Sequence, residues 1–305
     1  MDLAVDAAGD AATESWLARL LPVDRLLLGY LAVVTVVAVA RAPRIPECWW
    51  LLPAHGLFVL LLVLLRRRNA GSVSRMLGEI YPLLLLLGLY AEIGVLNSPA
   101  APVHDARVQR WEMALFGAQV SAEWWKAAPS RFWSAVLHGA YFSYYLIVSL
   151  PAILLLWRGR IAEARHFVLT VMAMFVSCYL AFIFFPVAGP YYAFPRPAAW
   201  FTDNGPARLV YATLAAGSSY GAAFPSSHVA AAVAATVAAF RSSRRLGLIL
   251  VVPTLLLTVG VVYCQMHYAV DAMAGAGTGM LMGILMGRAR GAGGGEREAA
   301  RRARA

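Results

Sequence analysis

Residues 51–68 read LLPAHGLFVLLLVLLRRR, an uncharged apolar run that ends in three consecutive arginines. A helix needs roughly 20 apolar residues to cross the hydrocarbon core of a bilayer. Backbone polar groups in lipid must bond internally, which leaves helices or a closed barrel. Extended to 47–65, the run is too long for the short alternating strands of a barrel, so it predicts a membrane helix.

The rest of the chain repeats this pattern. Of its 305 residues, 61% are hydrophobic and only 14% are charged, and the mean hydropathy is +0.65. A soluble domain carries about 25% charged residues. We therefore expect an all-α, polytopic membrane helix bundle with six to eight transmembrane helices. The candidate helices lie near 24–41, 47–65, 76–96, 131–157, 164–185, 225–241, 245–264 and 267–287.

Two of these helices are unusual. Glu79 and Glu92 bracket the core of the helix at 76–96, so it could lie at the interface or face a polar cavity. The helix at 225–241 is rich in alanine and only marginally apolar, so we expect it to be buried among the others.

The net charge of +10 comes from arginines that flank the apolar runs. This is a membrane pattern, not the basic patch of a nucleic-acid-binding domain. In an eight-helix topology the arginine-rich segments fall on one side, which the positive-inside rule assigns to the cytoplasm together with both termini. These segments are 66–75, 158–165, 241–245 and 288–304.

The remaining connections then lie on the extracytoplasmic side. Residues 105–119 have the pattern of an amphipathic interfacial helix. Residues 186–224 are rich in proline and glycine, so we expect little regular structure there. We divide the chain into an N-terminal segment with two membrane helices (1–75), a membrane domain (76–290) and a basic disordered tail (291–305).

Two polar clusters stand out because ionisable groups are rare in membrane helices. The first is Phe224-Pro225-Ser226-Ser227-His228, which opens the helix at 225–241. Pro225 suits the first helical turn. The free N–H groups of that turn, with the hydroxyls of Ser226 and Ser227, form a potential anion site beside His228.

The second cluster is His267-Tyr268-Ala269-Val270-Asp271, at the start of the last helix. His267 and Asp271, four residues apart, share a helical face, and a carboxylate beside an imidazole fixes its tautomer. Small residues at the same spacing allow close approach by another helix, so this face should point into the bundle. These are Gly275, Gly279, Gly283 and Gly287. The predicted topology brings His228 and His267 to the same membrane face.

These motifs resemble the type 2 phosphatidic acid phosphatase superfamily, and more narrowly its branch that contains inositol phosphorylceramide synthase. The segment 185–192 resembles the proline- and aromatic-rich segment of that branch. The resemblance covers roughly residues 75–287 and implies a six-helix phosphatase-like core. It implies a mechanism without metal or other cofactor, with His267 as nucleophile, Asp271 orienting it, and His228 as general acid.

The chain departs from the typical phosphatases of that superfamily at two basic positions. Gly189 stands where they have a lysine, and Gly260 and Val261 stand where they have Ser-Arg. A phosphoryl group in transfer needs balancing charge. We expect Arg196 to supply it and Tyr191 to donate a hydrogen bond, with Arg208, Lys126 and Arg131 as alternative cations.

The leading hypothesis is a lipid phosphate phosphatase, or a phosphotransferase with an alcohol acceptor such as inositol. Its expected partners are a lipid phosphate and the bilayer, with no nucleic acid. A transporter that uses the three ionisable residues as a proton relay is the alternative, although such groups usually lie at the membrane midplane. A catalytically inactive scaffold also fits the sequence.

Overall fold

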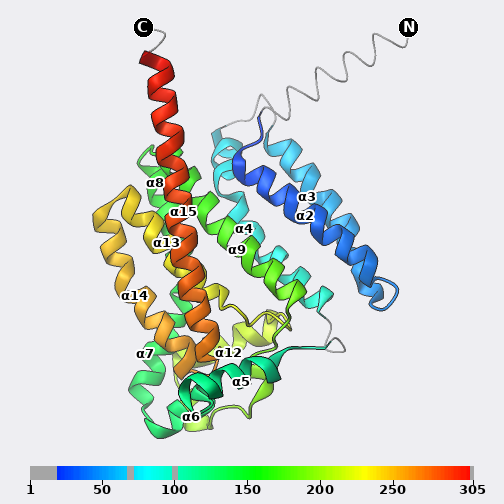
Figure 1. Ribbon diagram of the computed structural model, residues 1–305, viewed down its shortest axis with the longest axis vertical. Coiled ribbons are helices and arrows are strands. Elements are labelled where there is room, and N and C mark those ends of the chain that lie inside the picture. Colours follow the sequence, from blue (N-terminus) through cyan, green and yellow to red (C-terminus); the bar gives the residue numbers. More distant parts are fainter. Residues whose placement is uncertain (1–18, 67–71, 98–101, 303–305) are drawn as a thin grey trace. The chain divides into compact units, whose positions relative to one another are not determined.

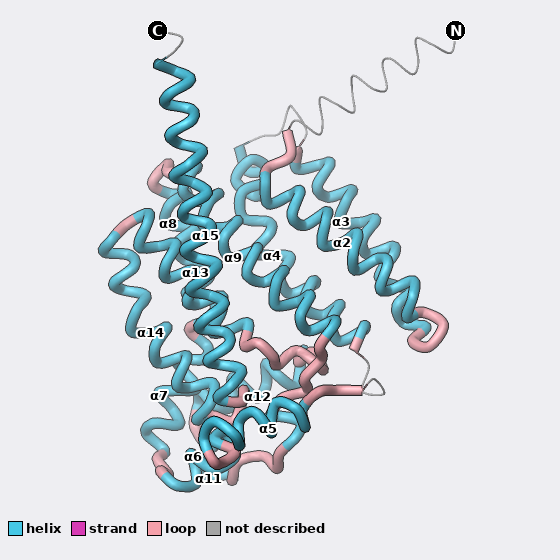
Figure 2. Tube along the Cα trace, viewed as in Figure 1, coloured by secondary structure: helices cyan, strands magenta, loops and turns pink. Residues whose placement is uncertain are grey.

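The computed structural model describes residues 19–66, 72–97 and 102–302 (Figures 1 and 2). The described residues are mostly helical and contain no strand, only an isolated bridge between Val187 and Ala222. The all-α prediction is therefore confirmed. The chain forms two compact units, Met1–Leu85 and Leu86–Ala305. The predicted start of the phosphatase-like domain at residue 76 stays a prediction.

The first unit contains α2 (Pro22–Arg41), η1 (Pro46–Trp50), α3 (Leu51–Leu65) and the first part of α4 (Ser72–Leu96). A buried carboxylate, Asp24, joins these helices. It accepts two hydrogen bonds from the Arg66 guanidinium, at 2.7 and 2.8 Å, and one from the Tyr81 hydroxyl at 2.5 Å. A buried charge is tolerated when it is paired in this way.

Among the described residues, six helices are long and apolar enough to span a membrane, which indicates a multi-pass membrane protein. They are Pro22–Arg41, Pro46–Leu65, Met76–Leu96, Ile161–Phe184, Arg244–Tyr263 and Ala269–Arg288. The single helix predicted at 131–157 is instead a pair, α7 (Arg131–Phe142) and α8 (Tyr144–Trp157), bent by 40°. At the break the Ser143 hydroxyl donates to the Ala140 carbonyl, a local bond that competes with the helix ladder.

The second unit is built around α13 (Ser227–Ser242), which has 16 residues. Most of its side chains are buried, as its alanine-rich sequence predicted. It packs against α15 (Ala269–Arg302), α14 (Arg244–Tyr263) and α9 (Ile161–Phe184). The glycine face of α15 lies on α13, since a Cβ at Gly275 would stand 2.6 Å from the Ser226 carbonyl oxygen.

The two ends of this unit differ in character. Figure 1 shows α5 (Asp105–Phe116), α6 (Val120–Ala127) and α12 (Gly205–Gly217) gathered at one end, away from the C-terminal end of α15. The arginine-rich turns that follow α8 and α13 lie together, because Arg160 donates to the Ser242 carbonyl at 2.6 Å. One end therefore carries loops and short helices, and the other carries the arginine-rich turns that follow α8 and α13.

Three segments differ from the sequence-based expectation. The segment 186–224 contains α10 (Pro190–Ala193), α11 (Ala199–Thr202) and the 13-residue α12, which Asn204 caps through the Ala207 N–H at 2.9 Å. The amphipathic helix ends at Phe116, because Gly117 is left-handed with φ of 69°. The helix α15 continues as far as Arg302, into the tail predicted to be disordered, where the alanines and arginines of 296–302 favour a helix and the glycines of 291–295 do not.

Candidate active site

His267 lies in a tight turn between α14 and α15. The N–H groups of Met266 and His267 both donate to the Val261 carbonyl, at 2.9 and 2.8 Å, and Gln265 adopts a positive φ of 60°. This closed turn leaves His267 only 5% exposed. The turn therefore holds His267 on a fixed backbone, and Figure 1 shows the junction of α14 and α15 at the end of the bundle that carries α5 and α6.

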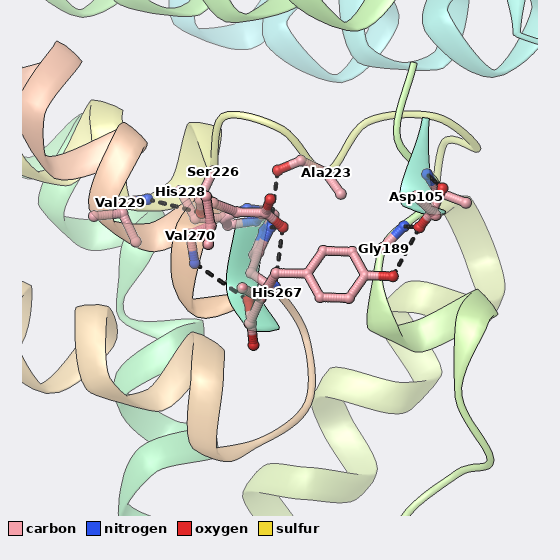
Figure 3. Close-up of polar contacts among 12 residues, drawn as sticks. Asp105, Gly189, Ala223, Ser226, His228, Val229, His267 and Val270 are labelled. Carbon is pink, nitrogen blue, oxygen red and sulfur yellow. Dashed lines mark hydrogen bonds and ion pairs between the residues drawn. The ribbon is translucent and has the colours of Figure 1, made fainter. Parts of the chain in front are cut away.

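The bonds of His267 fix its chemical form. Its Nδ1 lies 3.1 Å from the Ala223 carbonyl oxygen and 3.5 Å from Asp271 Oδ2 (Figure 3). A carbonyl oxygen can only accept, so Nδ1 carries the proton and Nε2 keeps a lone pair. Burial lowers the pKa of His267 to about 4, so the ring is neutral near pH 7. A neutral imidazole with a free Nε2 is a competent nucleophile.

Asp271 supports the same turn. It is fully buried on the first turn of α15, and Oδ2 also accepts from the Tyr268 N–H at 2.9 Å. Its backbone carbonyl accepts from the Ser226 N–H at 3.0 Å, which ties α15 to the start of α13. In the described part of the chain, Oδ1 has no hydrogen-bond partner.

His228 comes from the first turn of α13. The sequence predicted Pro225 in the first turn of this helix. In the structure Pro225 lies before the helix, because Ser226 is the N-cap. The His228 ring stacks on Tyr141, with ring centroids 4.8 Å apart, and its Nε2 lies 3.1 Å from the Tyr141 hydroxyl. Its centroid is 4.6 Å from that of Tyr144. Within the described residues, Nδ1 is buried without a partner.

The structure brings the two histidines together. Their ring centroids lie 5.8 Å apart with the planes tilted by 58°. His228, His267 and Asp271 thus form one constellation, assembled from the starts of α13 and α15. Ser226 and Ser227 flank it, although the Ser226 side chain already caps α13 by accepting from the Val229 N–H at 3.5 Å (Figure 3).

Comparison with known families agrees with this site. The family model described as PAP2 superfamily matches residues 106–285, more than half of the chain. The chain belongs to the PAP2 superfamily. No curated protein and no solved structure gives a significant match. Members of the PAP2 superfamily are typically phosphatases or phosphotransferases, so membership and the membrane spans indicate a membrane enzyme of this type.

The structure explains why this PAP2 chain lacks the typical lysine. Gly189 has φ of 90°, and a Cβ there would stand 2.8 Å from the Cβ of Ala223. The adjacent carbonyl of Ala223 is the one that His267 Nδ1 contacts. A lysine at position 189 would therefore strain the backbone and displace Ala223, whose carbonyl oxygen contacts His267.

The typical Ser-Arg pair is excluded in the same way. A Cβ at Gly260 would stand 2.8 Å from the Leu137 carbonyl oxygen on α7. Val261 is fully buried, which leaves no exposed position for an arginine there. At both positions the backbone packs closely against a neighbouring segment.

Arg196 and Tyr191 form a pair of their own. The guanidinium donates to the Tyr191 hydroxyl at 2.8 Å and lies over the rings of Tyr191 and Tyr211, 4.7 and 5.8 Å from their centroids. The neighbouring Pro195 carbonyl accepts from Gln265 at 2.8 Å, which connects this loop to the His267 turn.

The alternative cations are engaged elsewhere. Arg131 and Arg208 both pair with Asp203 on the surface, and Lys126 lies over the Trp125 ring, 5.5 Å from its centroid. Arg196 and Lys126 each lie beside a residue that bonds to Gln265 in the turn of His267, Pro195 and Trp125 respectively.

Sequence reasoning missed three residues that contact the site. Tyr141 bonds to His228, and the two carboxylates of α5, Asp105 and Glu112, reach the turn around His267. The two acidic residues are seven apart, which places them on one face of the predicted amphipathic helix. That spacing was the signal in the sequence that could have identified Asp105 and Glu112. The sequence around Tyr141 gives no such signal, because Tyr141 lies in an apolar helix.

Proposed function

We propose that this protein is an integral membrane enzyme that transfers a phosphoryl group from a lipid phosphate through a phosphohistidine at His267. The observation that carries the proposal is the facing pair of imidazoles, 5.8 Å apart, of which one has a free Nε2. Two imidazoles from different helices can act on opposite sides of one phosphoryl group.

In the first step, Nε2 of His267 attacks phosphorus. A P–N bond forms, the P–O bond to the leaving group breaks, and His228, which the bound phosphate anion would help to protonate, gives its proton to the leaving oxygen. Asp271 stabilises the positive charge that develops on the His267 ring. The 3.5 Å separation of Asp271 Oδ2 from Nδ1 supports this role.

In the second step, water or an alcohol attacks the phosphohistidine. His228 now accepts the proton of the attacking hydroxyl, and the P–N bond breaks to restore His267. Water yields a phosphatase, and an alcohol such as inositol yields a phosphotransferase. The two activities share the first step and differ only in the acceptor.

The phosphate oxygens need donors that persist through both steps. The N–H groups at the start of α13, with Ser226 and Ser227, would bind them, because a helix N-terminus favours anions. Arg196 would balance the remaining charge, and Tyr191, which holds its guanidinium, would orient it.

We assign the protein to the branch that contains inositol phosphorylceramide synthase. The support is the segment 185–192 together with Gly189 and Gly260, where packing excludes the basic residues of the typical phosphatases. We also infer that both termini are cytoplasmic and the active site is extracytoplasmic. The arginines at the end opposite α5 and α6 support this orientation.

A donor and acceptor panel tests the proposal. Purified protein in detergent would be given ³²P-labelled phosphatidic acid, a polyprenyl pyrophosphate or phosphatidylinositol, with and without myo-inositol. Inorganic phosphate released regardless of inositol would establish a phosphatase. A labelled inositol phosphate formed from phosphatidic acid or the pyrophosphate only when myo-inositol is present, or a new inositol lipid, would establish a transferase.

His267→Ala should abolish every such product, whereas His166→Ala, a histidine change on α9, should retain them. The absence of label transfer from any lipid, with folded protein, would reject the proposal. That result would favour the alternative hypotheses, a transporter or an inactive scaffold.

A further inference from the structure

Asp105, at the start of α5, bonds to two backbone segments that lie beside His267, one at Ala188 and Gly189 and the other at Tyr268. Its carboxylate accepts from the N–H groups of Ala188 and Gly189, at 2.7 and 2.8 Å. It also accepts from the Tyr268 hydroxyl at 2.9 Å (Figure 3). Asp105 is 9% exposed and Tyr268 is fully buried. Hydrogen bonds to an ionised acceptor are roughly twice as strong as neutral ones.

Each of the two segments that Asp105 contacts is linked to His267. Tyr268 is the next residue in the chain, and its N–H donates to the same Asp271 oxygen that faces His267 Nδ1. Gly189 packs against Ala223, whose carbonyl oxygen is the second acceptor at Nδ1. The carboxylate therefore spans the two backbone segments that determine where the imidazole points.

A second carboxylate on the same face of α5 extends this contact. Glu112 is fully buried and accepts from the Val270 N–H at 3.3 Å, at the start of α15. Between the two acids, Val108 belongs to a buried apolar cluster with Tyr268, Val270 and Ala223. The cluster anchors α5 independently of Asp105, so removing the charge need not unfold the site.

We propose that Asp105 is a positioning residue that holds His267 as the Nδ1–H tautomer, with Nε2 directed at phosphorus. This inference rests on the proposed function. Asp105 acts through Tyr268 and Gly189, the residues to which its carboxylate is bonded. Asn at position 105 keeps the shape but offers only one acceptor oxygen, and its NH₂ group would face an N–H donor.

The kinetic test compares Asp105→Asn, Tyr268→Phe and the double variant. For each, kcat and KM would be measured per folded molecule, with a phosphatidylinositol donor. We expect Asp105→Asn to lower kcat by about tenfold or more with little change in KM, because small misplacements of reacting groups slow the chemical step. The double variant should lose less than the product of the two single effects, since both act through one contact.

Glu163→Gln is the matched control, because Glu163 accepts two bonds from Arg160 at the opposite end of the unit. It should leave kcat unchanged. A wild-type kcat in Asp105→Asn would overturn the inference.

A spectroscopic test does not depend on turnover. In protein labelled with ¹⁵N-histidine, His267→Gln would assign the His267 signals. We expect one Nδ1–H tautomer in the wild type and a mixture of tautomers in Asp105→Asn. A single unchanged tautomer in the variant would overturn the inference. If the wild type transfers no phosphoryl group, the proposed function fails, and these spectra still decide the role of Asp105.

Discussion

A Cβ at Gly275 would stand 2.6 Å from the carbonyl oxygen of Ser226, so the backbones of α15 and α13 touch near the starts of both helices, beside His267 and His228. A Cβ at Gly279, one turn further, would collide with the backbone of Ala230. Close approach of these helices, rather than any polar link alone, brings His228 to His267.

Gly275→Ala should therefore separate the two helices and reduce phosphoryl transfer. Overpacking at such a contact costs about 1–3 kcal/mol. We expect a lower melting temperature in detergent and a fall in kcat, measured on the same preparation. Gly277→Ala is the matched control, because nothing lies within 4 Å of a Cβ at that position. If Gly275→Ala and Gly277→Ala had the same melting temperature and kcat, the contact between α15 and α13 would not determine the geometry of the site.

The glycine spacing made this contact predictable from sequence. A small residue every fourth position from Gly275 indicated a close helix neighbour, and the structure identifies that neighbour as α13. The pairing of His267 with Asp271 was also predicted, but from a helical face that His267 does not share, because α15 begins only at Ala269 and His267 lies in the turn before it. Local spacing is visible in sequence because a helix imposes it.

Other features could not be read from one sequence. The break at Ser143 and the helix α12 depend on local side-chain bonds, those of Ser143 and Asn204, within segments whose composition suggested otherwise. The contact of Asp105 with Tyr268 joins residues 163 positions apart. Sequence periodicity carries no information at that separation, so α5 was predicted only as an interfacial helix.

Gly189→Lys should not restore a typical phosphatase site. The positive φ of 90° and the 2.8 Å approach to Ala223 leave no room for a side chain. We expect loss of folded protein and of activity, with a cost of at least about 1 kcal/mol from the backbone alone. Thermal unfolding in detergent measures it. Gly217→Lys is the control, since a Cβ there meets open space. Higher phosphatase activity in Gly189→Lys would refute this explanation.

Tyr141→Phe should slow proton transfer by His228. The change removes only the hydroxyl that lies 3.1 Å from Nε2. A hydrogen bond to a charged group is worth roughly 1.5–3 kcal/mol, so we expect a fall in kcat of about tenfold or more. The defect should shrink with a lipid analogue that has a good leaving group, such as nitrophenol. Tyr145→Phe serves as the control, and a defect independent of the leaving group would count against the role.

The acid limb of the pH profile should lie well below pH 6.5. Burial depresses the pKa of His267 to about 4, below the ordinary value of about 6.5, so the folded protein keeps Nε2 unprotonated through pH 5. The unfolded chain binds the extra proton, and stability should therefore fall as pH drops from about 6.5 to 4. Initial rates of phosphoenzyme formation with a phosphodiester donor measure the limb. A limb centred near 6.5 would contradict the assignment.

The central claim is that His267 carries the phosphoryl group, and trapping the phosphoenzyme tests it most directly. Protein would be mixed with a ³²P-labelled donor, quenched in alkali, which preserves phosphohistidine, and mapped by mass spectrometry. We predict label on His267 in the wild type, more label in His228→Ala when the donor has a good leaving group, and none in His267→Ala. Product formation by His267→Ala, or label on another residue, would contradict the account.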